Sequence, residues 1–111
     1  MSDLAGKTCV PCRGGVPPLE KTAAEGYLED APGWALMDGA KRIERKFTFK
    51  NFKESLAFVN QVGAVAEDEG HHPDISFGWG YATVALHTHK IKGLHENDFI
   101  MAAKINRLAA A

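Results

Sequence analysis

Apolar residues recur at helical spacing in three parts of this chain, residues 19–28, 52–66 and 101–108. Each part is bounded by residues that favour the start or the end of a helix, so we predict three helices. The boundary residues are Pro17-Pro18 and Pro32-Gly33 for the first helix, Asn51, Glu54 and Gly70 for the second, and Gly93 and Asp98 for the third.

Between these parts the pattern changes to the period of a strand. In residues 43–50 apolar and polar side chains alternate, except that Arg45 shares the side of Ile43 and Phe47. The dipeptide Asp38-Gly39 favours a two-residue hairpin turn, which predicts a further strand before it. Residues 75–77 and 81–89 predict a second hairpin around Gly78-Trp79-Gly80, with alternate residues of the later strand facing the core and His87 and His89 facing away from it.

The predicted order is α-β-β-α-β-β-α. Two hairpins that join in one four-stranded antiparallel sheet, with three helices on one face, form a two-layer α+β domain. The other face of such a sheet stays open to solvent. We therefore expect the outward-facing histidines to lie at that open face.

Composition adds limits to this picture. The 111 residues are 45% hydrophobic and 24% charged, which is typical of one globular domain. The net charge is −1, so nucleic acid is not the expected partner, and the basic run KRIERK is better explained as the solvated face of a strand. No apolar run suits a membrane span and no signal-peptide pattern is present, so we expect a cytoplasmic protein.

The first 16 residues differ in composition from the rest. We predict a flexible leader over residues 1–16, which contains Cys9 and Cys12, and a single domain over residues 17–111. A lone Cys-x-x-Cys needs a second pair to make a zinc ribbon, or a flanking strand and helix to make a redox motif. Neither is present, so the pair is interpreted as incidental, with fortuitous metal binding as the alternative.

The histidines carry the candidate chemistry. His71 and His72 follow the second predicted helix directly before Pro73, and Glu67 lies one turn earlier. One of this pair could simply cap the helix, because a cation is favoured at a helix C-terminus. Histidine has an unperturbed pKa of about 6.5, so several histidines around one pocket favour general acid–base catalysis.

Two other kinds of chemistry are less well supported by the residues. The His-x-His of residues 87–89, together with a third histidine, could form a three-histidine zinc site, but nothing in the sequence orients the rings for a metal. Neither cysteine and none of the serines lies in a motif for a nucleophile. Acid–base catalysis is therefore the first interpretation, and a three-histidine zinc site stays the alternative.

The segment from residue 67 to residue 98 resembles the signature of the pterin-4a-carbinolamine dehydratase family. In that signature an acidic residue is followed, after three positions, by His-His-Pro. An aromatic residue comes next, then a histidine after nine further positions, and finally an aspartate. Here the matching residues are Glu67, His71-His72-Pro73, Trp79, His89 and Asp98. The resemblance extends from about Leu19 to Leu108. It departs from the family at His95, where a serine or threonine helix cap is common.

The resemblance implies an α-β-β-α-β-β-α fold and the dehydration of a 4a-hydroxytetrahydropterin to a quinonoid dihydropterin, with neither cofactor nor metal. It implies that His71 and His89 transfer the protons and that His72 holds the pterin. The remaining candidates for substrate binding or orientation are Glu67, Pro73, Trp79, His87, Thr88 and Asp98. Asp98 could equally be only a helix-capping acid.

The resemblance also implies partners. The substrate would come from an aromatic amino acid hydroxylase in tetrahydrobiopterin recycling, and the chain would form a homodimer or homotetramer, which the open sheet edges also favour. The alternative function is non-catalytic: members of the family act as dimerisation cofactors of a transcription factor, and related folds act as assembly factors.

Overall fold

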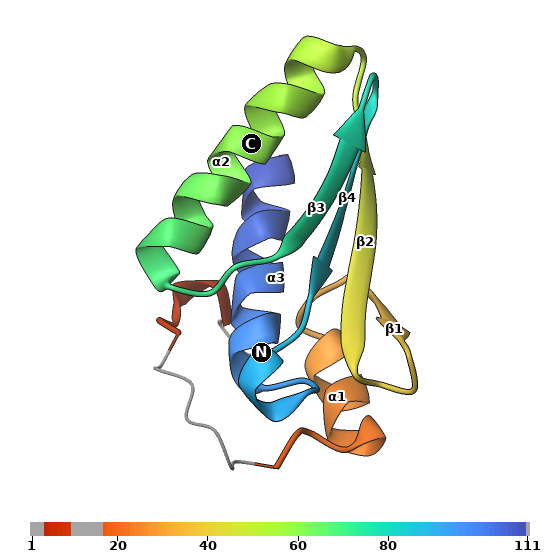
Figure 1. Ribbon diagram of the computed structural model, residues 1–111, viewed down its shortest axis with the longest axis vertical. Coiled ribbons are helices and arrows are strands. Elements are labelled where there is room, and N and C mark those ends of the chain that lie inside the picture. The colour runs from red at the N-terminus through yellow and green to blue at the C-terminus, as the bar shows by residue number, and fades with distance from the viewer. Residues whose placement is uncertain (1–3, 10–16, 111) are drawn as a thin grey trace.

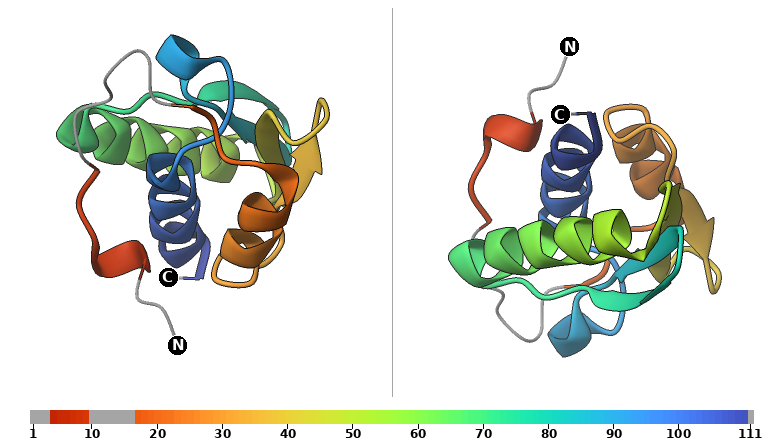
Figure 2. Two further views of the ribbon diagram at one scale, coloured as in Figure 1. Left: turned by 90° about the horizontal axis from the view of Figure 1, so that it is seen from below. Right: turned by 90° about the horizontal axis from the view of Figure 1, so that it is seen from above.

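The computed structural model describes residues 4–9 and 17–110 and confirms the predicted architecture. Three α-helices cover one face of a four-stranded antiparallel sheet, as Figures 1 and 2 show from three directions. The strands lie in the order β1-β2-β4-β3. The bounds are Lys21–Leu28 for α1, Ala35–Met37 for β1, Arg42–Thr48 for β2, Phe52–Glu69 for α2, Asp74–Gly78 for β3, Tyr81–Leu86 for β4 and Glu96–Ala110 for α3.

The second helix, α2, begins and ends as its sequence predicts. The side chain of Asn51 accepts a hydrogen bond from the backbone N–H of Glu54 at 2.9 Å, and the Glu54 carboxylate accepts one from the N–H of Lys50 at 3.2 Å. These bonds satisfy N–H groups at the helix start. At the other end Gly70 has a φ of +65°, the left-handed conformation in which glycine is favoured over other residues. The chain therefore turns sharply out of α2 into His71.

Three boundaries differ from their predictions. The helix α1 begins at Lys21, later than the prolines suggest. The first hairpin has a four-residue loop, since Met37 pairs with Arg42, and Asp38, Gly39 and Ala40 all have positive φ. The strand β4 ends at Leu86 rather than at His89.

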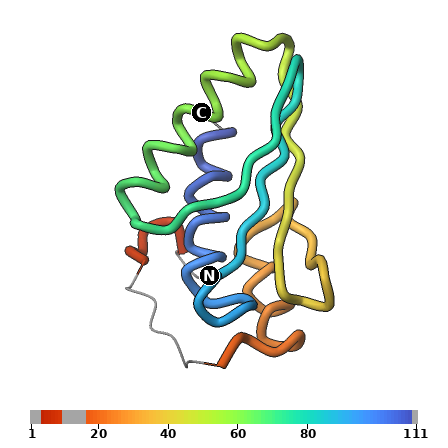
Figure 3. Tube along the Cα trace, viewed as in Figure 1, coloured from red at the N-terminus to blue at the C-terminus, as the bar shows by residue number. Residues whose placement is uncertain are grey.

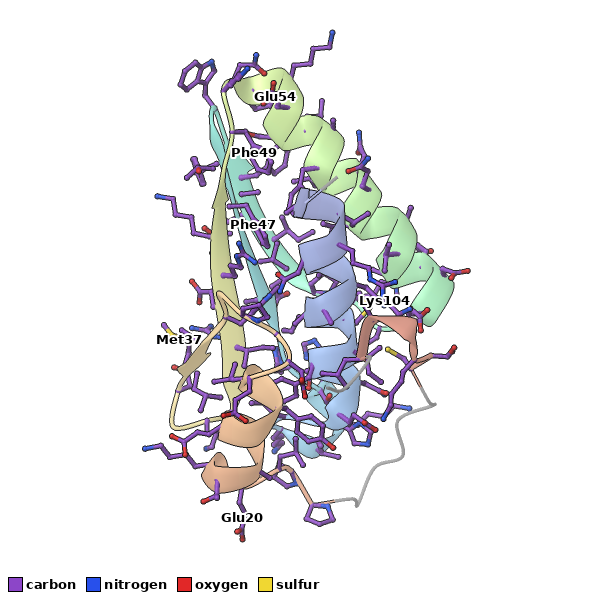
Figure 4. All side chains as sticks on the ribbon, turned by 180° about the vertical axis from the view of Figure 1, so that it is seen from behind. Glu20, Met37, Phe47, Phe49, Glu54 and Lys104 are labelled. Carbon is purple, nitrogen blue, oxygen red and sulfur yellow. The ribbon has the colours of Figure 1, made fainter. Side chains whose placement is uncertain are left out.

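The core lies between the sheet and the helices. Ile43, Val84 and Leu86 from the sheet pack against buried residues of α2 and α3, among them Phe58 and Phe99. Phe47 of β2 and Phe49, just after β2, extend toward the helices in Figure 4, and each has its ring centroid within 5.1 Å of that of Phe58. This burial is the main stabilisation of the two-layer fold.

Arg45 faces the helices, as its position in the alternation predicts. Its guanidinium donates to the side-chain oxygen of Asn106 on α3 at 2.6 Å and lies over the ring of Phe47. Trp34 is buried and donates its indole N–H to the same oxygen at 2.9 Å. The residues around Asn106 thus join α3 to β2 and to the segment before β1.

Part of the N-terminal leader contacts the domain. Leu4–Gly6 forms a short 3-10 helix, η1, and Leu4 is buried against the core. Lys104 of α3, labelled beside η1 in Figure 4, donates to the carbonyl of Ala5 at 3.0 Å. The backbone N–H of Cys9 donates to the Glu69 carboxylate at 2.7 Å. Residues 10–16, including Cys12, lie outside the described residues, so the interpretation of the cysteine pair stays a prediction.

The membrane prediction can be compared with the helices that are described. Within residues 4–9 and 17–110, none of the helices combines the length and the apolar character needed to cross a bilayer.

Candidate active site

The buried carboxylate of Asp98 is the centre of the site. It is fully buried at the start of α3 and accepts three hydrogen bonds. Its Oδ1 lies 2.7 Å from Nε2 of His71, and its Oδ2 accepts from the hydroxyl of Thr88 at 2.8 Å and from the backbone N–H of His95 at 3.0 Å. Donors on both oxygens stabilise the ionised carboxylate, so His71 donates through Nε2–H. Its Nδ1 then keeps a lone pair that can accept a proton.

Asp98 also caps α3. The carboxylate at the third helical position reaches back to the N–H of His95, and Nδ1 of His95 accepts from the N–H of Asn97 at 3.1 Å. This arrangement resembles a capping box with histidine in place of serine or threonine, but the His95 side chain bonds the second helical N–H rather than the third. The sequence left open whether Asp98 orients the site or caps the helix. The geometry shows that its carboxylate caps the helix and also contacts His71.

His71 and His72 differ in their surroundings although they are adjacent. His71 is 9% exposed and its backbone N–H donates to the carbonyl of Ala66 in the last turn of α2. His72 is exposed, and its Nε2 contacts the carboxylate of Glu67. The turn at Gly70 therefore directs one imidazole inward to Asp98 and leaves the other at the surface.

The loop after β4 supplies His87 and His89. His87 and Thr88 follow β4 directly, and His89–Ile91 forms a 3-10 helix, η2. The loop is closed because the N–H groups of Thr88 and Gly93 donate to each other's carbonyls at 2.8 and 3.4 Å. This turn folds His89 back toward His87, so that His87 Nε2 and His89 Nδ1 lie 3.1 Å apart.

These segments enclose one pocket of about 370 Å³, near the lower end of the size range for small-molecule sites. It is lined by Gly70, His71, His72, His87, Thr88, His89 and Lys90. The three histidines predicted as catalytic therefore meet in one place, together with the two predicted wall residues. Gly70 and Lys90 also line it, and the sequence analysis did not single them out for this role.

The other predicted residues lie behind or away from this pocket. Asp98 and Glu67 contact His71 and His72, whereas Pro73 leads from the histidines into β3. Trp79 is not brought to the pocket. It is 71% exposed at the β3–β4 turn, and Figure 3 shows that this turn lies at the opposite end of the sheet from the loop that follows β4.

A family model described as pterin 4 alpha carbinolamine dehydratase matches residues 17–108 of the chain. The chain belongs to this family. The match covers the described domain except the last two residues of α3, and it includes the three predicted catalytic histidines and Asp98. It agrees with the family resemblance that the histidine pattern indicates.

Relatives of this dehydratase family match nearly the whole chain. A protein of Cupriavidus pinatubonensis, provisionally named pterin-4-alpha-carbinolamine dehydratase 1, is 62% identical over 107 residues, which cover 96% of this chain and 92% of the relative. A protein of Azoarcus with the same provisional family name is 56% identical over 109 residues, which cover 98% and 93% of the two chains.

Two solved structures share the fold. A transcriptional coactivator/pterin dehydratase from Brucella melitensis has a TM-score of 0.78 and 34% identity, over 83% of this chain and 98% of its own. A pterin dehydratase-like protein identified as a RuBisCO assembly factor in the alpha-carboxysome has a TM-score of 0.63 and 24% identity, over 74% and 95%. The second likeness concerns the fold alone.

Proposed function

We propose that this chain dehydrates 4a-hydroxytetrahydropterins to quinonoid dihydropterins by general acid–base catalysis. The observation that carries the proposal is the buried His71–Asp98 pair opening on a pocket that His72 and His89 also line. In the reaction the hydroxyl on C4a leaves as water after it gains a proton, and N5 loses a proton. The products are one dihydropterin and one water, so protons are conserved without an oxidant.

Each histidine has a proposed role that follows from its surroundings. His71 accepts the N5 proton through Nδ1, because Asp98 holds its Nε2–H. His89 is exposed at the pocket and delivers the proton to the leaving hydroxyl. His72 binds the pterin, oriented by Glu67. General acid–base assistance of this kind contributes about a hundred- to ten-thousand-fold in rate.

The experiment follows the absorbance of quinonoid dihydropterin as it forms from a freshly prepared 4a-hydroxytetrahydropterin. His71→Ala and His89→Ala should lower kcat, whereas His72→Ala should mainly raise KM. Lys46→Ala, on the outer face of β2, is a control that should leave both unchanged. Full turnover in both of the first two variants would refute the assignment of the proton-transfer pair.

The proposed setting is the recycling of a tetrahydropterin cofactor in the cytoplasm after an aromatic amino acid hydroxylase has used it. We also propose that the chain forms a homodimer or homotetramer. Among the described residues, the edge strands β1 and β3 each have one neighbour in the sheet. Phe52, Leu56 and Trp79 are exposed apolar side chains, and the ring of Phe52 packs against that of Phe77 in β3. Light scattering during size exclusion would measure the mass, and a 12.1 kDa monomer at micromolar concentration would contradict this proposal.

Partner binding is the second candidate function, because the names of the two solved structures include a coactivator and an assembly factor. A pull-down that returns a regulator or a hydroxylase equally well with wild type and with His71→Ala would support binding independent of catalysis. Capture of the same proteins by resin that carries no chain would remove that support.

A further inference from the structure

Three possible metal ligands meet beside the pocket, and the proposed dehydration does not require all of them. They are Asp74 at the start of β3, His87 after β4 and His89 at the start of η2. One donor atom of each lies within 4.8 Å of a donor atom of the other two. Two imidazoles and one carboxylate form a donor set that suits zinc and similar divalent transition metals.

The sheet register brings the carboxylate to the histidines. Asp74 pairs with Ala85 across β3 and β4, and residues two apart on a strand point to the same face. His87 follows Ala85 by two positions, so it leans over the outer face next to Asp74. Its Nδ1 lies 3.9 Å from the Asp74 carboxylate, whereas its Nε2 faces His89, so for an ion bound at Nε2 the exposed Asp74 side chain must turn toward that nitrogen. Residues 74 and 87 are thus neighbours because of pairing that the whole β3–β4 hairpin maintains.

The turn after β4 then adds the third donor. His89 folds back on His87, with ring centroids 4.0 Å apart and ring planes at 60°. The 3.1 Å between His87 Nε2 and His89 Nδ1 is close to the separation of about 3.3 Å between two ligands of a tetrahedral zinc ion with bonds near 2.05 Å. In the metal-free pair one ring donates an N–H to the other, and a metal ion would replace that shared proton.

Exposure and charge are compatible with a metal. Asp74 and His89 are exposed and the His87 side chain is 27% exposed, so an ion and its water can enter. A hollow beside the site is lined by Asp38, Lys41, Arg42, His87, His89 and Lys92. Of its cations, Arg42 lies 3.4 Å from the carboxylates of both Asp38 and Glu44, which offset its charge. Lys41 and Lys92 are exposed at that hollow, where water screens them.

We propose that Asp74, His87 and His89 bind one divalent transition-metal ion of the zinc class, with water in the remaining coordination position. The site lies on the open face of the sheet, outside the hydrogen-bonded group of His71, Thr88 and Asp98. Glu44 provides a matched control, because it also pairs with Ala85 from the neighbouring strand β2 and lines the same outer face, yet it is not one of the three grouped donors.

The experiment titrates the full chain, stripped of metal by chelator, with Co²⁺ and follows its visible absorption, and then with Zn²⁺ by calorimetry. Wild type and Glu44→Gln should each bind one ion per chain, and the affinity of Glu44→Gln should fall far less than tenfold, because Asp38 still offsets the charge of Arg42. Asp74→Asn should weaken binding at least tenfold, and His87→Ala should abolish it, since each removes one of three protein ligands. Circular dichroism of each variant shows that the fold is kept.

Binding by the cysteines has a distinct signature. Cobalt thiolates absorb strongly in the near ultraviolet, and a cysteine site would be unaffected by Asp74→Asn. Equal affinity of Asp74→Asn and wild type, or a spectrum with thiolate bands alone, would overturn the proposal.

One consequence rests on the proposed function. His89 cannot hold a metal and transfer a proton to the pterin at once, so Zn²⁺ should inhibit dehydration by wild type and by Glu44→Gln, and Asp74→Asn should need at least tenfold more Zn²⁺ for the same inhibition. Asp74→Asn should keep basal activity. If the chain shows no dehydratase activity, the titrations still decide whether the metal site exists, so the two proposals can fail separately.

Discussion

Replacing Asp98 by asparagine should reverse the direction of the hydrogen bond to His71. The Oδ2 position of Asp98 accepts from both Thr88 and His95, so the single carbonyl oxygen of asparagine should take that place. Its NH₂ group then faces Nε2 of His71, 2.7 Å away, and Nε2 must become the acceptor. The proton of His71 moves to Nδ1, and the lone pair that we assign to the N5 proton is lost.

The size of the effect follows from what is lost and what is kept. Loss of the base should lower kcat by about a hundred- to ten-thousand-fold, or about 2.7–5.5 kcal/mol in activation free energy. KM should change little, because His72 and His89 still line the pocket. Losing a hydrogen bond to a charged group should cost about 1.5–3 kcal/mol in folding free energy, which is less than the stability of a typical domain.

The assay is steady-state dehydration measured at 20 °C and at several pH values, with thermal unfolding recorded for each variant. Thr88→Val is the control: it removes one donor to Asp98 but leaves both carboxylate oxygens, so it should cost less than Asp98→Asn. In addition, His71→Ala combined with Asp98→Asn should be no slower than His71→Ala alone, since Asp98 acts through His71. A folded Asp98→Asn with turnover within about threefold of wild type would refute the reasoning.

Three further predictions concern the rest of the fold. Asn106→Leu should lower the free energy of unfolding by about 1–3 kcal/mol in urea titrations, because the buried indole N–H of Trp34 loses its acceptor, and an unchanged midpoint would contradict this. Burial, and then the charge of Glu69, raise the pKa of the Cys9 thiol to about 12. In a Cys12→Ser chain at pH 8, Cys9 should therefore react with iodoacetamide about a hundredfold more slowly, or slower still, when the chain is folded than when it is unfolded in urea. Equal rates would contradict the burial of Cys9. The hydrogen bond from the N–H of Cys9 lowers the pKa of Glu69 below its usual 4.5. The free energy of unfolding that Glu69→Gln loses should therefore be largest at neutral pH and should shrink as the pH falls below 4.5. A loss that does not change with pH would contradict the lowered pKa.

The elements with local signals could be predicted from the sequence. Asn51, Glu54 and Gly70 act within a few residues of themselves, so the bounds of α2 follow from them closely. Alternation likewise assigned the two faces of β2, including the inward position of Arg45, which needs the distant Asn106 as a partner. In such cases the sequence pattern and the tertiary contacts act in the same direction.

The predictions were wrong or silent where contacts distant in sequence decide the outcome. Asp38-Gly39 promotes a turn, but the pairing of Met37 with Arg42 makes the loop longer than the dipeptide suggests. Similarly, the alternating pattern runs on to His89, whereas the mutual hydrogen bonds of Thr88 and Gly93 end the strand earlier. Those bonds move His89 from a strand face to the turn where it meets His87.

The proposed base lies between the ends of two helices. His71 directly follows the C-terminus of α2, where a cation is stabilised, and Asp98 lies in the first turn of α3, where an anion is stabilised. Each helix end contributes about 0.3–1 kcal/mol to the favoured charge at a surface and more when partly buried. When His71 accepts a proton it becomes an imidazolium paired with the Asp98 carboxylate, so both helix dipoles and the hydrogen bond at 2.7 Å stabilise the charged pair. The packing of α2 against α3 therefore positions the two side chains and also favours the charges that proton transfer creates.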